Sequence, residues 1–344
     1  MRFKVLFGFG NNMKCQFCRS VFIPNRSTLN NNVPSRMLTS NGNFKDEELV
    51  LFFKNEVQTL LRKLTGLNLE KVFASRKLGE KLEPPKYKFM TTDQVEKAIE
   101  KSKKEAEEML QMPPVVPVRK EIDVVLTKDP ELIGYSESKF VFTDISFGKT
   151  DRTRTIVVRD LDGTLRQAFW SERRNANQTY FPRPGREFKA PKMFQPEYLK
   201  PILERGDYVF ILDRACVEYD ADDPDYHRVT QATYSEVDEK QAYSSLRFTR
   251  HYGPMVFYLV LNKNIDNLLL ENLKTDRLDD AAALISLYHI IHPSAKSAAA
   301  KLTPGQEIAF VKEYIDKDSK TKIALELALM PYVEPSREVS SSSS

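Results

Sequence analysis

Alternating apolar and polar residues predict a small antiparallel β region near the middle of the chain. Three runs rich in β-branched and aromatic residues carry this signal: Phe140–Phe147, Thr155–Arg159 and Thr164–Trp170. Such composition is typical of strands. Asp162-Gly163 separates the last two runs, and an Asp-Gly pair between strand-like segments is a strong signal for a tight hairpin turn. We therefore predict a β-hairpin around this pair.

A two-residue Asp162-Gly163 loop would place Arg159 directly opposite Arg166. Like charges that face each other across two antiparallel strands repel. A polyanion lying over the two guanidiniums would turn this repulsion into attraction, because arginine binds phosphate oxygens in pairs. The register therefore predicts a phosphate-facing hairpin, and a solvated, arginine-rich hairpin is the plainer alternative.

Before the β region, apolar residues recur at helical spacing. A stripe of Leu and Val residues predicts one helix over 46–64. Thr91-x-x-Gln94 is a capping box that opens a second helix, which reaches about residue 111. The second helix has only a thin apolar stripe, so it is either solvated or laid on a partner, and we favour the partner. Prolines at 113, 114 and 117 predict a stiff, extended connector.

After the β region, the pattern is helical to the end of the chain. A short helix is predicted over Ser171–Gln178. Further helices are predicted over Tyr198–Tyr219, Ser235–Arg247, Tyr252–Leu261, Ile265–Asp276, Arg277–His292, Pro304–Asp316 and Lys320–Met330. The predicted fold class is therefore α+β and mainly α-helical. It has a small antiparallel β-hairpin sheet in the middle, a helical C-terminal domain and an extended helical N-terminal arm.

Charge and composition divide the chain into five expected segments. Residues 1–45 contain seven Lys/Arg and no Asp/Glu, which is typical of a mitochondrial transit segment, a disordered basic tail being the alternative. Cys15-x-x-Cys18 within it is weak evidence for zinc because no second pair follows. The other expected segments are a helical arm and Pro-rich connector (46–118), a basic, RNA-facing β-hairpin region (119–192), a helical domain (193–334) and a disordered Ser tail (335–344).

Basic residues gather around the predicted hairpin. Lys149–Lys192 holds eleven Lys/Arg and five Asp/Glu, a net charge of +6, whereas the whole chain carries only +4. A basic patch of this kind attracts nucleic-acid backbone. The neighbouring Tyr180 and Phe181 either stack on bases or anchor their loop to the core. The candidate nucleic-acid-binding residues are Arg159, Arg166, Arg173, Arg174, Arg183, Arg186, Lys189 and Lys192.

The hairpin turn also allows an enzymatic alternative. An apolar strand that ends in Asp160, with Asp162 two residues on, looks like the first motif of haloacid-dehalogenase-like, Mg²⁺-dependent phosphatases. There the first carboxylate is the nucleophile and the second the general acid. No apolar strand leading into a pair of metal-binding acids follows downstream, and a hairpin turn explains the same letters, so the phosphatase is the less favoured interpretation.

Other classes of chemistry find little support in the composition. The longest apolar run, Met255–Leu261, has seven residues, whereas a membrane span needs about twenty. Three cysteines imply no disulfide framework. His289 and His292 share a helix face, but a helix C-terminus that favours positive charge explains them more simply than a metal does. We expect no catalytic residue, no metal, no cofactor and no small-molecule substrate.

A series of short sequence stretches, spread in a fixed order over about residues 46–334, resembles one known family. That family is the animal mitochondrial ribosomal small-subunit proteins numbered twenty-two. The stretches that carry the resemblance are Thr65-Gly66-Leu67-Asn68-Leu69, Pro84-Pro85-x-Tyr87, Met112-Pro113-Pro114-Val115, Gly163-Thr164-Leu165-Arg166, Thr249-Arg250-x-Tyr252-Gly253 and Tyr288-His289-x-x-His292-Pro293.

The resemblance implies a structural protein of the mitoribosomal small subunit in the mitochondrial matrix. It implies small-subunit rRNA and other mitochondrial ribosomal proteins as partners, and no catalysis. The family's turn before Gly163 need not carry acids, which counts against a catalytic Asp160 or Asp162. No short RNA-binding motif is carried over from the family, so the eight candidate residues depend on charge and register alone.

Overall fold

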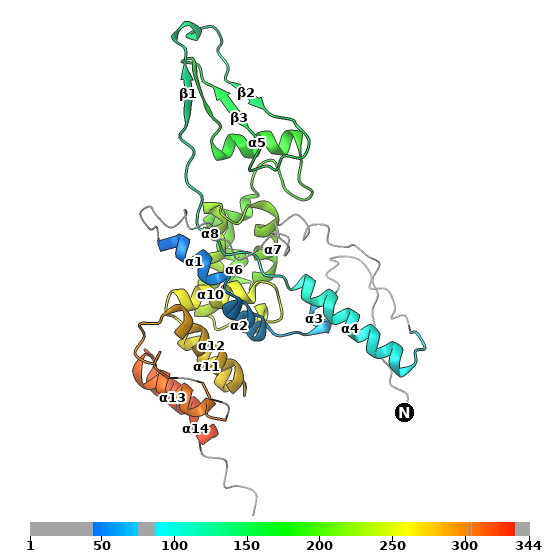
Figure 1. Cartoon of the computed structure of the whole chain (residues 1–344), viewed down its shortest axis with the longest axis vertical. Coiled ribbons are helices and arrows are strands. Elements are labelled where there is room, and N and C mark those ends of the chain that lie inside the picture. The colour runs from blue at the N-terminus through cyan, green and yellow to red at the C-terminus, as the bar shows by residue number, and fades with distance from the viewer. Residues whose placement is uncertain (1–43, 75–86, 301, 304, 334–344) are drawn as a thin grey trace, which may run out of the picture.

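The computed structural model describes residues 44–74, 87–300, 302–303 and 305–333. Helices dominate, and one four-stranded antiparallel sheet, which lies between the N-terminal helices and the C-terminal helical body in the sequence, stands at one end of the molecule (Figure 1). This confirms the predicted fold class. The proposed Ser tail and residues 1–43 of the proposed transit segment lie outside the described residues, and the last two residues of that segment belong to the first helix.

The predicted helix over 46–64 is two helices, α1 (Phe44–Phe52) and α2 (Asn55–Thr65). Lys54 has an extended backbone, with φ −58° and ψ 133°, which breaks the helical path. The Gln58 side-chain amide donates to the freed Phe52 carbonyl at 2.7 Å, which compensates for the lost helical bond. The short α3 (Leu69–Val72) follows.

Helix α4 (Thr92–Met109) begins at the predicted capping box. The Thr91 N–H donates to the Gln94 side-chain oxygen at 3.2 Å, so the first turn is closed as expected. The helix extends away from the body (Figure 1), and Ala106 is its only buried residue. Its proposed contact with a partner stays a prediction.

Four short strands form the sheet in the order β1-β4-β3-β2. They are β1 (Val125–Lys128), β2 (Phe140–Thr143), β3 (Ile156–Arg159) and β4 (Thr164–Gln167). The sequence pattern missed β1, and it extended β2 and β4 too far. Strands β2, β3 and β4 follow one another as antiparallel neighbours, while β1 pairs with the far edge of β4. We call this sheet together with helix α5 (Trp170–Tyr180) the β module.

The predicted pairing of Arg159 with Arg166 is wrong. Arg159 faces Leu165, and Arg166 faces Val158. The turn has three loop residues instead of two, because the Asp160 N–H donates to the Thr164 carbonyl and the Gly163 N–H donates to the Asp160 carbonyl. Gly163 adopts a φ of +78°, which ends a three-residue hairpin loop. One extra loop residue moves the two arginines to opposite faces of the sheet.

Helix α5 covers one face of the sheet. Ile156, Val158, Ala168 and Ala176 form a small buried cluster between them. The helix starts one residue before the predicted range and ends two after it. The Glu172 carboxylate accepts the Phe169 N–H at 2.9 Å and so satisfies one donor of the first turn.

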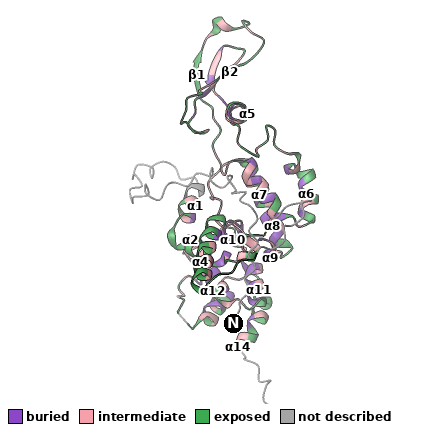
Figure 2. Cartoon of the chain, turned by 90° about the vertical axis from the view of Figure 1, so that its right-hand side faces the viewer, coloured by how far each residue is buried: buried purple, intermediate pink, exposed green. Residues whose placement is uncertain are grey.

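The helical body contains nine α-helices, counted over the described part of residues 196–333. They are α6 (Pro196–Glu204), α7 (Tyr208–Glu218), α8 (Pro224–Glu239), α9 (Tyr243–Leu246), α10 (Tyr252–Leu261), α11 (Asp266–Lys274), α12 (Leu278–Ile291), α13 (Glu307–Lys317) and α14 (Lys322–Val333). Helix α10 lies within the main core, and Met255, Val256 and Phe257 are fully buried there (Figure 2).

Two predicted helices of the body are divided differently in the structure. The segment over 198–219 is broken at Gly206, which has a φ of +81°. The helix predicted from Ser235 begins earlier, at Pro224, because the Asp223 side chain caps it by accepting the Asp225 N–H. None of the helices within the described ranges is both long and apolar enough to cross a membrane.

Candidate functional site

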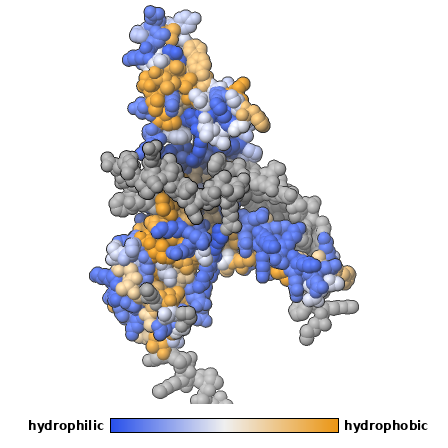
Figure 3. Space-filling model, in the orientation of Figure 1, coloured by the Kyte–Doolittle hydropathy of each residue, from blue (hydrophilic) through white to orange (hydrophobic). Residues whose placement is uncertain are grey.

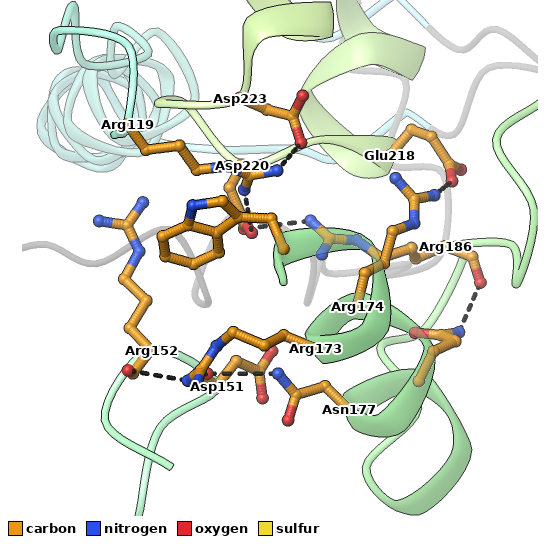
Figure 4. A pocket seen from close by; sticks show the side chains of 12 residues that line it. Arg119, Asp151, Arg152, Arg173, Arg174, Asn177, Arg186, Glu218, Asp220 and Asp223 are labelled. Carbon is orange, nitrogen blue, oxygen red and sulfur yellow. Dashed lines mark hydrogen bonds and ion pairs between the residues drawn. The ribbon is translucent and has the colours of Figure 1, made fainter. Parts of the chain in front are cut away.

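Some of the candidate basic residues lie at the base of the β module, where it meets the helical body (Figure 4). The structure brings Arg173, Arg174 and Arg186 together in one cluster. The carboxylates that face them come from the end of α7 and the α7–α8 loop, 30 to 50 residues further along the chain. We call this cluster the junction.

Arg166 is buried inside the β module. Its guanidinium donates to Asp160 at 2.6 Å and to Glu172 at 2.8 Å and 2.9 Å. These charge-assisted hydrogen bonds, with that to Glu172 first, raise the pKa of Arg166. They lower the pKa of Glu172 and of Asp160. Both carboxylates therefore stay ionised, and they already occupy the donors that a phosphate would need.

Arg173 is also buried, and it contacts main-chain oxygens instead of carboxylates. Its guanidinium donates to the carbonyls of Asp151 (3.2 Å), Arg152 (3.2 Å) and Arg154 (2.7 Å). Burial lowers the pKa of this guanidinium from its ordinary value. Arg173 therefore closes the loop between β2 and β3 onto helix α5.

Three of the predicted arginines join the β module to the body. Arg174 on α5 pairs with Glu218 at the end of α7. Arg183 and Arg186 both reach Asp220, at 2.9 Å and 3.2 Å. Arg183 also binds Asp151 of the module at 2.5 Å, so it bridges the two parts of the chain.

Residues outside the predicted set complete the junction. Arg119 in the connector donates to Asp223 at 2.6 Å, and its guanidinium lies over the Trp170 ring at 4.5 Å. Arg152 pairs with Asp222 at 2.9 Å. The cationic side chains thus come from the connector and the β module, and the anionic ones come mainly from the helical body.

Burial and charge act in opposite directions on the junction carboxylates. Burial raises the pKa of Asp220, but the guanidiniums of Arg186 and Arg183 more than offset this, and the net pKa lies below its ordinary value. At Asp223 burial outweighs the attraction of Arg119, and the pKa is raised. The junction therefore combines carboxylates that resist protonation with one that accepts a proton more readily.

The junction offers no room for a ligand. Five guanidiniums and four carboxylates line a cavity of about 30 Å³, which is close to the volume of a single water molecule. Opposite charges nearly cancel within it. Its side chains pair mainly with one another, although Arg119 Nε, Arg173 Nε and Asn177 Oδ1 have no hydrogen-bond partner among the described residues. Their effect is to fix the orientation of the β module.

Besides Arg173, three of the predicted residues are not paired with a carboxylate in the described part of the chain. Arg159 donates to the Gly163 carbonyl at 3.0 Å. Lys189 and Lys192 are exposed on the segment between α5 and α6. The register that motivated the arginine pair is wrong, but RNA contact by the eight residues is untested and stays a prediction.

Phe181 and Tyr180, the two aromatic residues beside the arginines, differ in their surroundings. The Arg154 guanidinium lies over the Phe181 ring at 3.6 Å, so Phe181 anchors its loop to the β module. Tyr180 is exposed.

Asp160 and Asp162 lie in the hairpin turn without a catalytic arrangement around them. The Asp160 carboxylate is occupied by Arg166 and by Lys139 at 2.9 Å. Asp162 accepts the N–H and hydroxyl of Thr164, at 3.1 Å and 2.9 Å. The hairpin explains both carboxylates, and nothing in this geometry supports the phosphatase alternative.

The two histidines are held by hydrogen bonds and ring contacts within the helical body. His289 hydrogen-bonds Ser297 at 2.8 Å, and His292 hydrogen-bonds the Val260 carbonyl at 2.8 Å. Burial lowers the pKa of His289. Across the described residues, no cluster of three or more His, Cys, Asp or Glu side chains is arranged to hold a metal ion.

Sequence reasoning missed the partners of the arginines. Four residues of the stretch Asp220–Asp225, which lies between two of the predicted helices, are aspartates. The excess of negative charge outside the basic region was the available signal. Which carboxylates would meet which arginines depends on the fold of the body, and the sequence alone does not give it.

A rigid β module, an extended helix and a helical body joined by internal ion pairs define a structural protein that presents surfaces to partners. Comparison with known proteins specifies the class. Residues 50–293 match the family model described as "Mitochondrial 28S ribosomal protein S22". The chain therefore belongs to the mitochondrial 28S ribosomal protein S22 family, which confirms the resemblance found in the sequence.

Two relatives support this assignment. The chain is similar to "Small ribosomal subunit protein mS22" of Mus musculus, with 38% identity over 304 residues, covering 88% of this chain and 84% of the relative. It is also similar to the protein of the same name from Bos taurus, with 39% identity over 284 residues, covering 82% and 79%.

Proposed function

We infer that this chain is a structural component of the small subunit of the mitochondrial ribosome, and that it acts in the mitochondrial matrix. The observation that carries this function is the family match over residues 50–293. The fold agrees with a structural role. The ion pairs of the junction hold the β module on the helical body, and several surfaces of the described chain stay exposed. We propose that the chain has no catalytic role.

Its proposed partners are small-subunit rRNA and neighbouring ribosomal proteins. The most favourable RNA contact lies on the segment between α5 and α6, where Lys189 and Lys192 are exposed and free of carboxylate partners in the described chain. Phosphate oxygens attract such lysines without requiring a particular base. Helix α4, which buries only Ala106, is the proposed contact to a neighbouring protein.

Charge reversal tests the RNA contact. The double variant Lys189→Glu, Lys192→Glu should leave the small subunit at lower salt than the unmodified chain does. Each lost phosphate contact should reduce the slope of log affinity against log salt by about 0.7–0.9. The measurement is release of the chain from purified small subunits in salt steps, followed by gradient sedimentation.

A matched control is the double variant Lys274→Glu, Lys312→Glu, which reverses two exposed lysines of the helical body. It should be released as the unmodified chain is. An unchanged salt profile for the 189/192 variant would remove these lysines from the RNA contact. Absence of the unmodified chain from the small subunit would contradict the proposed function itself.

A further inference from the structure

Within the described part of the chain, one face of the sheet in the β module is uncovered. Residues paired across antiparallel strands share a face, so Phe140 and Phe142 of β2 lie on the same side as Arg159, Val157 and Leu165. This is the side away from α5, because Ile156 and Val158 face the helix. Phe140 is 46% exposed and Phe142 54% exposed. Figure 3 shows hydrophobic side chains gathered on the β module at the top of the view.

A cavity of about 200 Å³ opens on this face. The two phenylalanines form one wall, and Leu132 and Tyr135 from the β1–β2 connection form another. Arg159, Asp160 and Leu161 line the cavity near the hairpin turn, and Ser136 and Ser138 complete the lining. A cavity of about 150 Å³ is enough to hold a benzene ring, so this one has room for an aromatic or large aliphatic side chain.

Gly163 brings the two sides of the cavity together. A Cβ atom at this position would lie 1.9 Å from the Asp129 carbonyl oxygen. The Asp129 N–H in turn donates to the Gly163 carbonyl at 3.1 Å. This close approach holds the connection that carries Leu132 and Tyr135 against the hairpin turn, so the cavity is a built feature of the fold.

The open face adjoins a free strand edge. Strand β2 is the last strand of the sheet order, and the Asp144 N–H donates to the Thr155 carbonyl of the β3 side at 3.0 Å. Hydrogen bonding alternates along an antiparallel strand, so Phe142 and Phe140 also point their main-chain groups toward β3. The N–H and carbonyl groups of Val141 and Thr143 therefore point away from the sheet, where an added strand would pair with them.

The charge around the cavity favours a protein over RNA. The lining segments 129–142 and 159–162 hold two cationic residues and five carboxylates, a net charge of −3. Such a rim repels phosphate and attracts lysine and arginine side chains. Arg159 uses one of its five N–H groups on Gly163, and it has donors left for a main-chain carbonyl of an added segment.

We propose that this face docks an extended, lysine- or arginine-bearing segment of a neighbouring small-subunit protein, which pairs with β2 and places one bulky apolar side chain in the cavity. The proposal rests on the inferred role in the small subunit and specifies one contact of that role. The segment's flanking cations face Glu131, Glu137 and the other acids of the rim. Its main chain lies over Arg159.

Site-specific photo-crosslinking tests the docked segment. Phe140 is replaced by p-benzoylphenylalanine in the full chain, and small subunits that contain it are isolated on gradients and irradiated. We expect a crosslinked peptide from another ribosomal protein with an apolar residue between Lys/Arg, identified by mass spectrometry. A crosslink to rRNA, only to this chain, or to nothing in subunits that contain the chain would overturn the proposal. Absence of the chain from the subunits would instead contradict its inferred function.

One double variant has opposite expected results for a protein and for an RNA occupant. Glu131→Lys with Glu137→Lys should lower the ratio of subunit-bound to free chain about tenfold, since a tenfold change corresponds to the loss of one good contact. An RNA occupant would make the same variant bind more tightly. Phe142→Ala should also lower the ratio. Phe147→Ala should not, because Phe147 is fully exposed and outside the cavity lining.

Hydrogen exchange of the β3 and β4 amides is the control that checks whether each variant keeps its sheet. A Phe142→Ala chain with native exchange and undiminished incorporation would contradict the docking face. So would a Glu131→Lys, Glu137→Lys chain that binds more tightly.

Discussion

At the scale of single residues, Gly163 decides the geometry of the β module. Its φ of +78° ends the hairpin loop, and its missing side chain admits the Asp129 carbonyl. Most other residues are strained at positive φ, and in this place any side chain also collides with main-chain atoms. The same glycine therefore sets the strand register and holds the connection that lines the cavity against the hairpin turn.

Gly163→Ala should destabilise the β module by roughly 1–3 kcal/mol more than a glycine substitution without a collision does. Gly134→Ala is the matched control, because Gly134 also has a φ of +78° but nothing within 4 Å of an added Cβ. The measurement is hydrogen exchange of the β3 and β4 amides in the two variants. Equal losses of protection would show that the Asp129 contact does not matter.

The ion pairs of Arg166 with Asp160 and Glu172 make the stability of the β module depend on pH. Their mutual hydrogen bonds lower the pKa of Asp160 and Glu172 in the folded chain. A lowered folded-state pKa adds stability above the unfolded-state value, and this stability is lost as the pH falls through the folded-state value. The ordinary values are 3.8 for Asp and 4.5 for Glu.

The protection of the sheet amides should therefore be level from pH 7 to about 5 and fall below about pH 4.5. Glu172→Gln should be less protected at pH 7 and should lose less on acidification. Raised protection at pH 3 relative to pH 6 would contradict the role assigned to these carboxylates.

At the scale of elements, the junction fixes how α5 and the strands lie on the helical body. Glu218 at the end of α7 is fully buried, and it accepts from both Arg174 and Arg214. Removing one partner of a buried ion pair leaves an uncompensated charge in a poorly solvated place. Glu218 is therefore the carboxylate on which the attachment of the module depends most.

Glu218→Gln should lower the free energy of unfolding by about 3 kcal/mol. It should also speed protease cleavage between α5 and α6, because the module is held less firmly. Glu187→Gln serves as the control, since Glu187 pairs with the same Arg214 but its side chain is 63% exposed. Exposed pairs contribute about 0–1 kcal/mol. Similar effects of the two changes in urea unfolding would contradict this account of the junction.

The sequence predicts an element well when the residues that fix its ends are close in the sequence, and poorly when distant residues fix them. Helix α10 matches its prediction at both ends because its apolar run and its flanking residues are local signals. The capping box places the start of α4 for the same reason. The hairpin register was missed because one left-handed glycine, supported by Asp129 from another loop, changes the loop length. Arg174 and Arg186 were interpreted as RNA ligands because their carboxylates lie more than 30 residues away.

At the scale of the whole molecule, charges that are separated in the sequence meet in the fold. The basic region from Lys149 to Lys192 is followed by the acidic stretch Asp220–Asp225, and the structure joins the two at the base of the β module. A basic segment in the sequence is therefore not a basic surface here. Among the described residues, the surfaces that we propose as partner contacts are the uncovered sheet face, helix α4 and the lysines between α5 and α6.

The central claim, that this chain is a built-in part of the mitochondrial small ribosomal subunit, is tested most directly by sedimentation of mitochondrial lysate. The amount of the chain in each gradient fraction is compared with that of small-subunit rRNA. We predict that the chain migrates with the small subunit and shifts to lighter fractions when the rRNA is digested. A chain that sediments as free protein while intact small subunits are present would contradict the account.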